Sequence, residues 1–449
     1  MMAILEVVLL SWLLGVIGQH SVPSFRNQGQ NPPMLDESSG WSDLEGFLEQ
    51  HALPENVTSE GLDARNHVQI LTNACLANAN NPSGQARDGG RPEWHQMSLR
   101  WMRARSEQGF VNGTTYWVND YMAIGHVMFD TQLLSVLTVP DLEVDKVILQ
   151  RAPCVTHDLC NKNGKKSVYE SFFLGHYGTL LDVADSVSKR GKTPANIYIR
   201  FMGKEQYWKP RPVRSEQALL RNTSYIDAVL PHTPYIRVQR VVCFERVLRR
   251  TTNRGFFYSL SVPMVRKFKQ FAVQQASDGK TNSQWNLPSR GPSRELCVTV
   301  VGREEIHARH MSNEEYLIQL LNRTLEGNTG DRVLKVRLFN SGSVQLTHSD
   351  QVMVSATSDI LVATHGAFET NVMYMPEGAL LLEIRGEDGQ FEREGDNFRG
   401  LAHTYMVHYR SVRARGLLSL RQKKYDLKRG EMQEIADIVL DYVKYKVGS

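Results

Sequence analysis

Apolar residues in the last third of the chain alternate between two spacings. Short runs rich in Val, Ile and Leu are typical of buried strands, and they occupy residues 295–303 (ELCVTVVGR), 332–339 (RVLKVRLF), 359–366 (DILVATHG) and 379–384 (ALLLEI). Segments with helical spacing lie between these runs, at residues 312–325, at residues 349–358 and from about Phe368. Because strands separated by helices form parallel βαβ units, we expect an α/β fold with a parallel sheet here.

Two of the helices carry further signals. Ser312 precedes the first helix at an N-cap position, and Glu315 stands three residues later, which is the spacing of a capping box. The segment 430–446 is amphipathic, and its apolar face contains Met432, Ile435, Val439 and Tyr442. This face predicts a terminal helix that packs on the rest of the domain.

The first half of the chain alternates less regularly. Strand-like runs lie at residues 144–150, 196–202 and 235–244, and residues 179–190 have helical spacing. Polar stretches rich in Pro, Gly, Ser and Asn interrupt the pattern at residues 19–60 and 274–296. We therefore expect a stem or linker at 19–60, an N-terminal domain at 61–273, an interdomain linker at 274–296 and a C-terminal domain at 297–449.

The N-terminus begins with a hydrophobic segment. Residues Val7 to Ile17 form a run that is apolar apart from Ser11, of signal-peptide length and too short to span a bilayer. Residues 1–18 are thus interpreted as a signal peptide or short membrane anchor, and an ordinary buried helix is the alternative. Secretory targeting predicts a protein of the endoplasmic reticulum or Golgi lumen, either free or anchored in the membrane through its N-terminus.

Composition narrows the class of protein. The 449 residues include 52 Lys and Arg against 48 Asp and Glu, without a block of like charge, so a nucleic-acid partner is not expected. The five cysteines include no CxxC pair, which argues against a zinc ribbon. Cys154 and Cys160 are close enough in sequence to close a short disulfide loop, and buried free thiols are the alternative.

The first candidate site is the sequence His365-Gly366-Ala367, which lies where a predicted strand ends and a helix begins. In a parallel sheet this is the carboxyl edge, where open α/β sheets bind ligands. Glycine allows close approach of the backbone, and a helix N-terminus offers free N–H groups to a phosphate. The alternative is a strand-terminal histidine that is hydrogen-bonded to its neighbours.

Two arginines are expected at the same edge. Arg303 ends a strand and Arg309 precedes the next helix, and arginine makes bidentate contacts to phosphate. The alternative is a pair of surface arginines that form weak ion pairs with Glu304 or Glu305.

In the first half, His126 and Asp130 are four residues apart and would share one face of a helix. A histidine and carboxylate pair can act as a general base and the group that orients it, and a helix cap or a satisfied core histidine fits equally well. The chain contains no Asp-x-Asp, Walker, GxGxxG or HExxH motif, so no metal site and no bound cofactor are predicted.

These segments together resemble glycosyltransferase family 61, which includes protein O-linked N-acetylglucosaminyltransferases of the secretory pathway and plant xylosyl- and arabinosyltransferases. The resemblance runs from about Tyr116 to Tyr409. It rests on residues 365–384 (HGAFETNVMYMPEGALLLEI), on the series Arg303, Arg309 and Asn313, on His126 with Asp130, and on residues 241–247 (VVCFERV).

The resemblance implies a GT-B-like arrangement, in which two Rossmann-like domains face each other across a cleft and the nucleotide sugar binds mainly to the C-terminal domain without a strict need for metal. The expected function is an inverting glycosyltransferase that uses a UDP-sugar, carrying N-acetylglucosamine or a pentose, and a protein or glycan acceptor. The alternative is an inactive homologue that only binds a nucleotide sugar or glycan.

Roles for individual residues follow from this expectation. The diphosphate is expected to contact Arg303, Arg309 and the 365–367 turn, with Asn313 and Asn371 near the nucleotide. Candidate catalytic bases are His126, Asp130 and Glu369, and Glu383 is assigned to a strand end or to the ribose.

Overall fold

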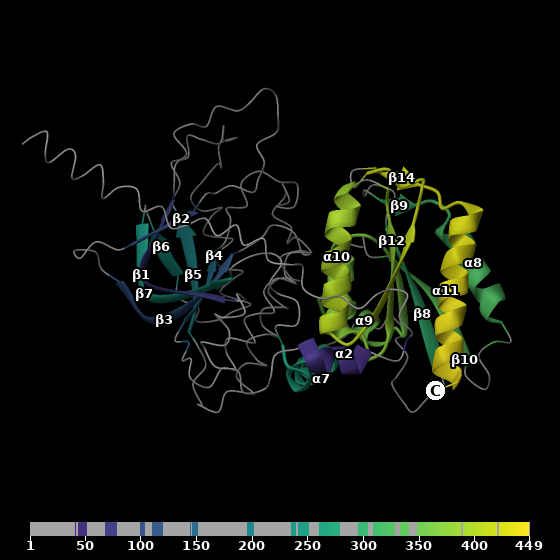
Figure 1. Ribbon diagram of the computed structural model, residues 1–449, viewed down its shortest axis with the longest axis horizontal. Helices are drawn as coiled ribbons and strands as arrows, with labels where there is room; N and C mark the ends of the chain where they lie inside the picture. Colours follow the sequence, from purple (N-terminus) through teal and green to yellow (C-terminus); the bar gives the residue numbers. More distant parts are fainter. Residues whose placement is uncertain are drawn as a thin grey trace, which may run out of the picture. The chain divides into compact units, whose positions relative to one another are not determined.

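The computed structural model describes a large part of the chain, and the described residues are 41, 44–51, 68–78, 99–103, 110–119, 144, 146–150, 195–201, 235–238, 241–250, 260–278, 295–303, 309–326, 328, 333–340, 348–387, 389–419 and 422–448. They contain two large sheets, which are drawn in colour in Figure 1 and are described separately below. The C-terminal sheet alternates with helices along the chain, as the α/β prediction requires.

The C-terminal sheet has five strands, all of them parallel. In spatial order these are β10 (Val333–Asn340), β8 (Glu295–Gly302), β11 (Ile360–Thr364), β12 (Leu380–Arg385) and β13 (His408–Arg413). The order corresponds to 2-1-3-4-5 along the chain, which is a doubly wound arrangement whose switch point lies between β8 and β11. The predicted parallel sheet is present, and four of its five strands were predicted.

Helices cover both faces of this sheet. One face carries α8 (Glu314–Leu325) and α11 (Arg429–Gly448), and the other carries α9 (His348–Ala356), the 3-10 helix η3 (Ala367–Tyr374) and α10 (Gly389–Thr404). Figure 1 shows α10 and α11 on opposite sides of the strands. Buried side chains alternate between the two layers, as the period-2 geometry of a strand dictates: Leu361 and Leu381 face the α10 layer, whereas Val362 and Leu382 face the α11 layer.

The terminal helix behaves as its sequence predicted. Its apolar face is buried, and it includes Met432, Ile435, Val439 and Tyr442. The helix α8 also forms, but the predicted capping box does not: the N-cap residue is Asn313, and the Ser312 hydroxyl instead donates a hydrogen bond to the carbonyl oxygen of Tyr425. Tyr425 belongs to the short strand β14 (Lys424–Tyr425), which pairs with β9 (His310–Met311). A contact over more than a hundred residues thus takes the place of the local cap.

Helix α7 (Val262–Asp278) packs on α9 and η3 of the C-terminal body. Its buried Lys269 donates from Nζ to the carbonyl oxygen of Met375 at 2.7 Å and also to that of Tyr405, which satisfies the ammonium group inside the protein. Residues 274–278 of the stretch that we assigned to a linker therefore belong to a packed helix.

Residues near the N-terminus also pack on the C-terminal body. The helix α2 (Leu44–His51) contacts α10 and buries Leu44 and Leu48. Trp41 donates from its indole N–H to the Asp441 carboxylate at 2.9 Å, and the Arg410 guanidinium lies 4.4 Å from its ring centroid. The segment that we expected to be a stem thus contains an anchor, which we define as Trp41 together with α2.

The second sheet has seven strands, in the order β2 (Leu99–Arg103), β1 (Val68–Asn78), β7 (Val241–Arg250), β3 (Phe110–Asn119), β4 (Lys146–Gln150), β5 (Ala195–Phe201) and β6 (Tyr235–Val238). The pairs β1–β2 and β1–β7 are antiparallel, and the remaining pairs are parallel. A bulge interrupts the pairing of β3 with β7 at Gly113, whose φ of 79° suits glycine. Cys75 and Cys243 are direct partners in the register of β1 and β7.

Three of the predictions concern residues that the structure does not describe. The leader at 1–18, the predicted helix at 179–190 and the pair Cys154 and Cys160 lie outside the described residues. Among the helices that the structure describes, none has both the length and the apolar character that a membrane span requires.

Candidate functional site

The candidate site lies at the switch point of the five-stranded sheet. Strand β8 ends at Gly302 and is followed by Arg303, and the neighbouring strand β11 ends at Thr364 and is followed by His365 and Gly366. Because β8 and β11 are parallel neighbours, their carboxyl ends meet at one edge of the sheet. The chain runs from β8 to α8 on one face of the sheet and from β11 to η3 on the other, and ligands of doubly wound folds bind at such a switch point.

Gly366 is the point where the two arginines meet. A Cβ atom built on this glycine would lie 2.1 Å from Nη2 of Arg303 and 3.2 Å from Nη1 of Arg309. A side chain at position 366 would therefore displace the Arg303 guanidinium. Both arginines are half-buried, so their charge is near the surface and only partly screened.

The segment after β8 holds the arginines in place. Arg309 donates from Nη1 to the carbonyl oxygen of His365 at 2.6 Å, and its own backbone N–H donates to Gln422 O at 2.6 Å. Its φ of 68° is unusual for a residue with a side chain, and such backbone conformations persist where the surrounding contacts enforce them. His310 adds a contact at 2.5 Å between Nδ1 and the carbonyl oxygen of Arg303.

The start of η3 lies beside the arginines. Glu369, the third residue of η3, accepts a hydrogen bond from the Gly366 N–H at 2.8 Å, which caps the helix. The N–H groups of the first residues of a helix, here Ala367 and Phe368, point out of its N-terminus because they have no partner within the helix. The helix dipole and the two guanidinium groups therefore favour an anion at the same place.

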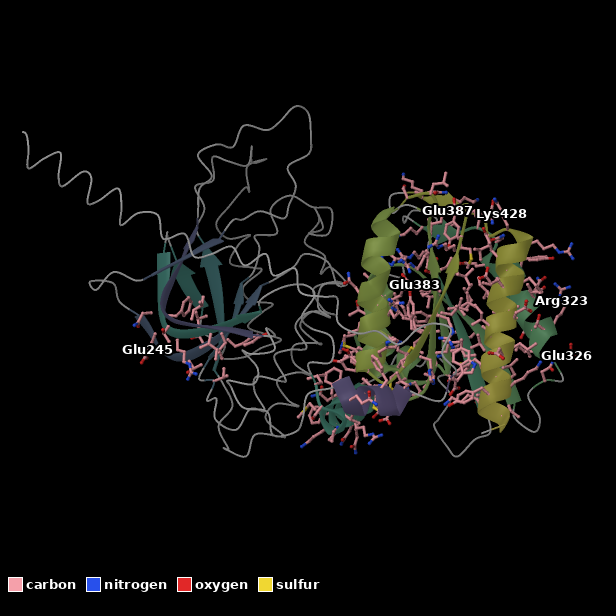
Figure 2. All side chains as sticks on the ribbon, in the orientation of Figure 1. Glu245, Arg323, Glu326, Glu383, Glu387 and Lys428 are labelled. Atoms are coloured by element: carbon pink, nitrogen blue, oxygen red, sulfur yellow. The ribbon has the colours of Figure 1, made fainter. Side chains whose placement is uncertain are left out.

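A buried acid and base cluster lies under this surface. Glu383 interrupts the apolar strand β12, and the alternation of that strand directs its side chain toward the α10 layer, as Figure 2 shows. Its carboxylate contacts Nδ1 of His365 and accepts a hydrogen bond from the hydroxyl group of Tyr409. The His365 ring also makes an edge contact with Phe398 of α10, at 5.2 Å between centroids. His365 is thereby fixed in orientation from two sides.

Glu369 completes the cluster. Its Oε2 lies 3.9 Å from Nδ1 of His365, and its side chain has no exposed surface. Burial raises the pKa of the Glu369 carboxyl well above its usual value, and the Glu383 carboxylate adds to this rise, while His365 and Arg303 oppose it. Glu369 therefore takes up a proton more readily than an exposed glutamate does.

His365, Glu369 and Glu383 are also the group of described residues that could hold a metal ion, since one ligand atom from each lies within 4.8 Å of the others. In this structure Nδ1 of His365 already contacts the carboxylate of Glu383. A metal ion would have to replace that contact inside a buried cluster that lies next to Arg303.

The structure brings together only part of the predicted site. Arg303, Arg309, His365, Gly366 and Ala367 lie at one sheet edge, as expected from the carboxyl ends of parallel strands. The candidate bases His126 and Asp130 lie outside the described residues, and Glu369 is buried as a cap of η3.

The two asparagines have structural partners. Asn313 clamps the backbone of Leu427, donating from Nδ2 to its carbonyl oxygen at 2.8 Å and accepting from its N–H at 3.1 Å. Asn371 is fully buried between η3 and α9, where Nδ2 donates to Gln351 Oε1 and to Phe368 O. Both amides therefore make contacts within the protein, and their expected place near the nucleotide stays a prediction.

Sequence analysis missed two tyrosines at the site. Tyr409 binds Glu383, and the Tyr425 hydroxyl is 2.5 Å from Thr364 Oγ1 at the end of β11. The sequence contained a signal for Glu383, the charged residue in the apolar run ALLLEI, but it contained none for its partner.

A half-buried histidine of α9 gives a testable pH dependence. His348 packs against Tyr374 of η3, with 3.2 Å between Nε2 and the hydroxyl oxygen, and desolvation lowers its pKa to about 4. The unfolded chain, with a pKa near 6.5, binds the proton more readily, so stability is complete above pH 6.5 and is lost as the pH falls toward 4. We expect this residue to account for a loss of about 2 kcal/mol between pH 7 and pH 5.

Urea unfolding at both pH values measures this loss. In His348→Gln the decrease in unfolding free energy should be smaller than in the wild type by that amount, whereas Tyr374→Phe, which retains the histidine, should keep the wild-type decrease. Equal decreases in His348→Gln and wild type would contradict the assignment.

Comparisons with known proteins point to the glycosyltransferases. The sequence model of the family described as Glycosyltransferase 61 matches residues 124–382, which is more than half of the chain. The EGF domain-specific O-linked N-acetylglucosamine transferase of Drosophila melanogaster is 23% identical over 39% of this chain, and that of Gallus gallus is 22% identical over 45%. The matched regions span 31% and 36% of those two proteins, about a third of their length.

Among solved structures, the glycosyl transferase family 9 protein from Veillonella parvula is 13% identical with a TM-score of 0.26. The match covers 67% of this chain and 86% of that protein.

Proposed function

Because the chain belongs to the Glycosyltransferase 61 family, we propose that it transfers a sugar from a nucleotide diphosphate donor to a hydroxyl group of a protein or glycan. The observation that carries this proposal is the convergence of Arg303 and Arg309 on Gly366, beside the N-terminus of η3 at the switch point. Fixed positive groups at this edge suit a diphosphate, and they stabilise the charge that develops on it as it leaves.

The donor in this proposal is a UDP-sugar that carries N-acetylglucosamine or a pentose. N-Acetylglucosamine is the first choice, because the names of the two matched relatives specify the transfer of that sugar to EGF domains. The acceptor would accordingly be a protein hydroxyl group in the lumen of the secretory pathway.

The proposed reaction is a single in-line displacement with inversion at the anomeric carbon. The donor diphosphate contacts Arg303, Arg309 and the N–H groups at the start of η3, and a base removes the proton of the acceptor hydroxyl as the bond from the anomeric carbon to the diphosphate breaks. His126 and Asp130 remain our candidates for the base, since the carboxyl of Glu369 has no exposed surface. In a GT-B arrangement these two residues would approach the donor from the N-terminal domain.

Metal-independent donor binding is also proposed, because the arginine pair supplies positive charge and the chain has no Asp-x-Asp motif. Calorimetric titration with UDP, GDP and a panel of UDP-sugars, with and without EDTA, tests it. UDP should bind with or without EDTA, and Arg303→Ala should weaken binding by about a hundredfold, because hydrogen bonds between two charged groups are lost.

Arg323→Ala is the matched control, since Arg323 is an exposed arginine of α8, at the outer surface of the C-terminal body in Figure 2. It should bind UDP as the wild type does. Failure of the wild type to bind any nucleotide would overturn the transferase proposal, and binding that disappears with EDTA would overturn the metal-independent part. UDP-sugar binding without transfer to any hydroxyl acceptor would favour the inactive, binding-only homologue.

A further inference from the structure

Glu314 is a carboxylate at the switch point without an assigned role. It is the first residue of α8, its side chain is half-buried, and its Oε2 atom is buried with no hydrogen-bond partner in the part of the chain that the structure describes. The N-cap residue Asn313 forms both of its amide hydrogen bonds with the backbone of Leu427, and Glu314 takes no part in them. An acceptor atom that is buried without a donor destabilises the free protein.

The backbone beneath Glu314 is shaped to admit it. A Cβ atom built on Gly302, the last residue of β8, would lie 2.6 Å from Oε2 of Glu314. Groups of opposite charge therefore lie against two glycines near the ends of adjacent strands. The arginine side chains lie against Gly366, and the Glu314 carboxylate lies against Gly302.

The hydroxyl of Tyr425 is close enough to these groups to feel their charges. Arg303, Glu314 and Arg309 all act on it, and it contacts Thr364 at the end of β11. Burial also raises the pKa of Glu314, with His310 opposing the rise and Glu315 adding to it. A carboxylate with free acceptor capacity, next to an anion site, is suited to a ligand that has hydroxyl groups close to a phosphate.

We propose that Glu314 is a specificity-determining residue that accepts hydrogen bonds from a vicinal diol of the nucleotide-sugar donor. This rests on the proposed function, because the donor places hydroxyl groups on both sides of its diphosphate. The ribose is the preferred diol, since acidic residues at the crevice of doubly wound sheets recognise ribose hydroxyl groups. The transferred sugar offers the same chemistry, and the ligands below separate the two sources.

The experiment compares UDP with 2′,3′-dideoxyuridine diphosphate by calorimetry, using wild type, Glu314→Ala and Glu315→Ala. Wild type should prefer UDP by about ten- to a hundredfold, because the carboxylate loses two charged hydrogen bonds when the diol is absent. Glu314→Ala should bind both nucleotides equally. Glu315→Ala, the exposed neighbour in the same helical turn, should keep the wild-type preference and controls for the loss of a charge near the N-terminus of α8.

UDP-sugars identify the second possible source. If Glu314→Ala retains the preference for UDP over the dideoxy analogue but loses the additional affinity that the sugar provides, the diol belongs to the transferred sugar, and the proposal stands in that form. Thermal unfolding of the three proteins verifies that Glu314→Ala is folded.

The assignment is overturned if Glu314→Ala keeps both preferences, because Glu314 then contacts no diol. A collapse of its turnover number with unchanged binding would then mean that the residue acts on the acceptor. If the wild type binds no nucleotide, the proposed function itself fails. If the wild type binds UDP and the dideoxy analogue equally, only the ribose assignment fails.

Discussion

Replacing Glu383 by alanine is expected to lower the free energy of unfolding by about 3–5 kcal/mol, the largest effect on stability that we predict for the site. Glu383 is fully buried and holds both Nδ1 of His365 and the hydroxyl of Tyr409. Its removal leaves two polar groups in the core without their partner and creates a cavity in β12, so both costs act together. Urea unfolding at pH 7 measures the change.

Glu377→Ala is the matched control. Glu377 is an exposed glutamate that pairs with Arg266 at 3.1 Å, and exposed ion pairs contribute at most about 1 kcal/mol. A loss in Glu383→Ala no larger than in this control would refute the buried cluster as a source of stability. Tyr409→Phe should lie between the two, because it removes one hydrogen bond and leaves the ring in place.

Gly366→Ala is expected to weaken UDP binding nearly as much as Arg303→Ala does, although the substitution adds only a methyl group. The new Cβ would occupy the position of the Arg303 guanidinium, which must then move away from the N-terminus of η3. The two substitutions act on one interaction, so their effects should not add: in the Arg303→Ala background, Gly366→Ala should change UDP affinity by less than about threefold.

Calorimetry on the four proteins of this double-mutant cycle gives the coupling free energy. Gly430→Ala is the control, because a Cβ at that exposed position in α11 would meet no atom within 4 Å. It should leave UDP binding unchanged and slightly stabilise the helix. Additive losses in the double variant would indicate that Gly366 acts through the backbone rather than through Arg303.

The strands that the sequence predicted most clearly are those with uniform burial. Strands β8, β11 and β12 are covered on both faces and therefore appear as continuous apolar runs. The edge strand β13 was missed because its sequence, HYRSVR, is mostly polar, and α10 was missed because much of residues 389–400 is charged or polar. Polar sequence hid β13 and α10, whereas β10, the strand at the opposite edge, was still predicted from its run RVLKVRLF.

The same distinction applies to the site. Arg303, Arg309 and Gly366 could be placed together because parallel strands present their carboxyl ends at one edge. Tyr425 and Glu383 acquire their partners through contacts that join distant parts of the chain, for which sequence spacing holds no information. The failed cap at Ser312 has the same cause, since the hydroxyl finds a partner 113 residues away.

The anchor formed by Trp41 and α2 constrains the order of events during synthesis. Trp41 and its partner Asp441 are 400 residues apart, so the ribosome makes the anchor long before the surface that receives it. Until α10 and α11 emerge, Leu44 and Leu48 have no apolar surface to cover them, and folding cannot finish domain by domain from the N-terminus. The apolar residues of the anchor must therefore be shielded while the rest of the chain is made. A chain that terminates before α11 would lack part of the surface that receives the anchor, so the packing of both ends of the protein would be lost.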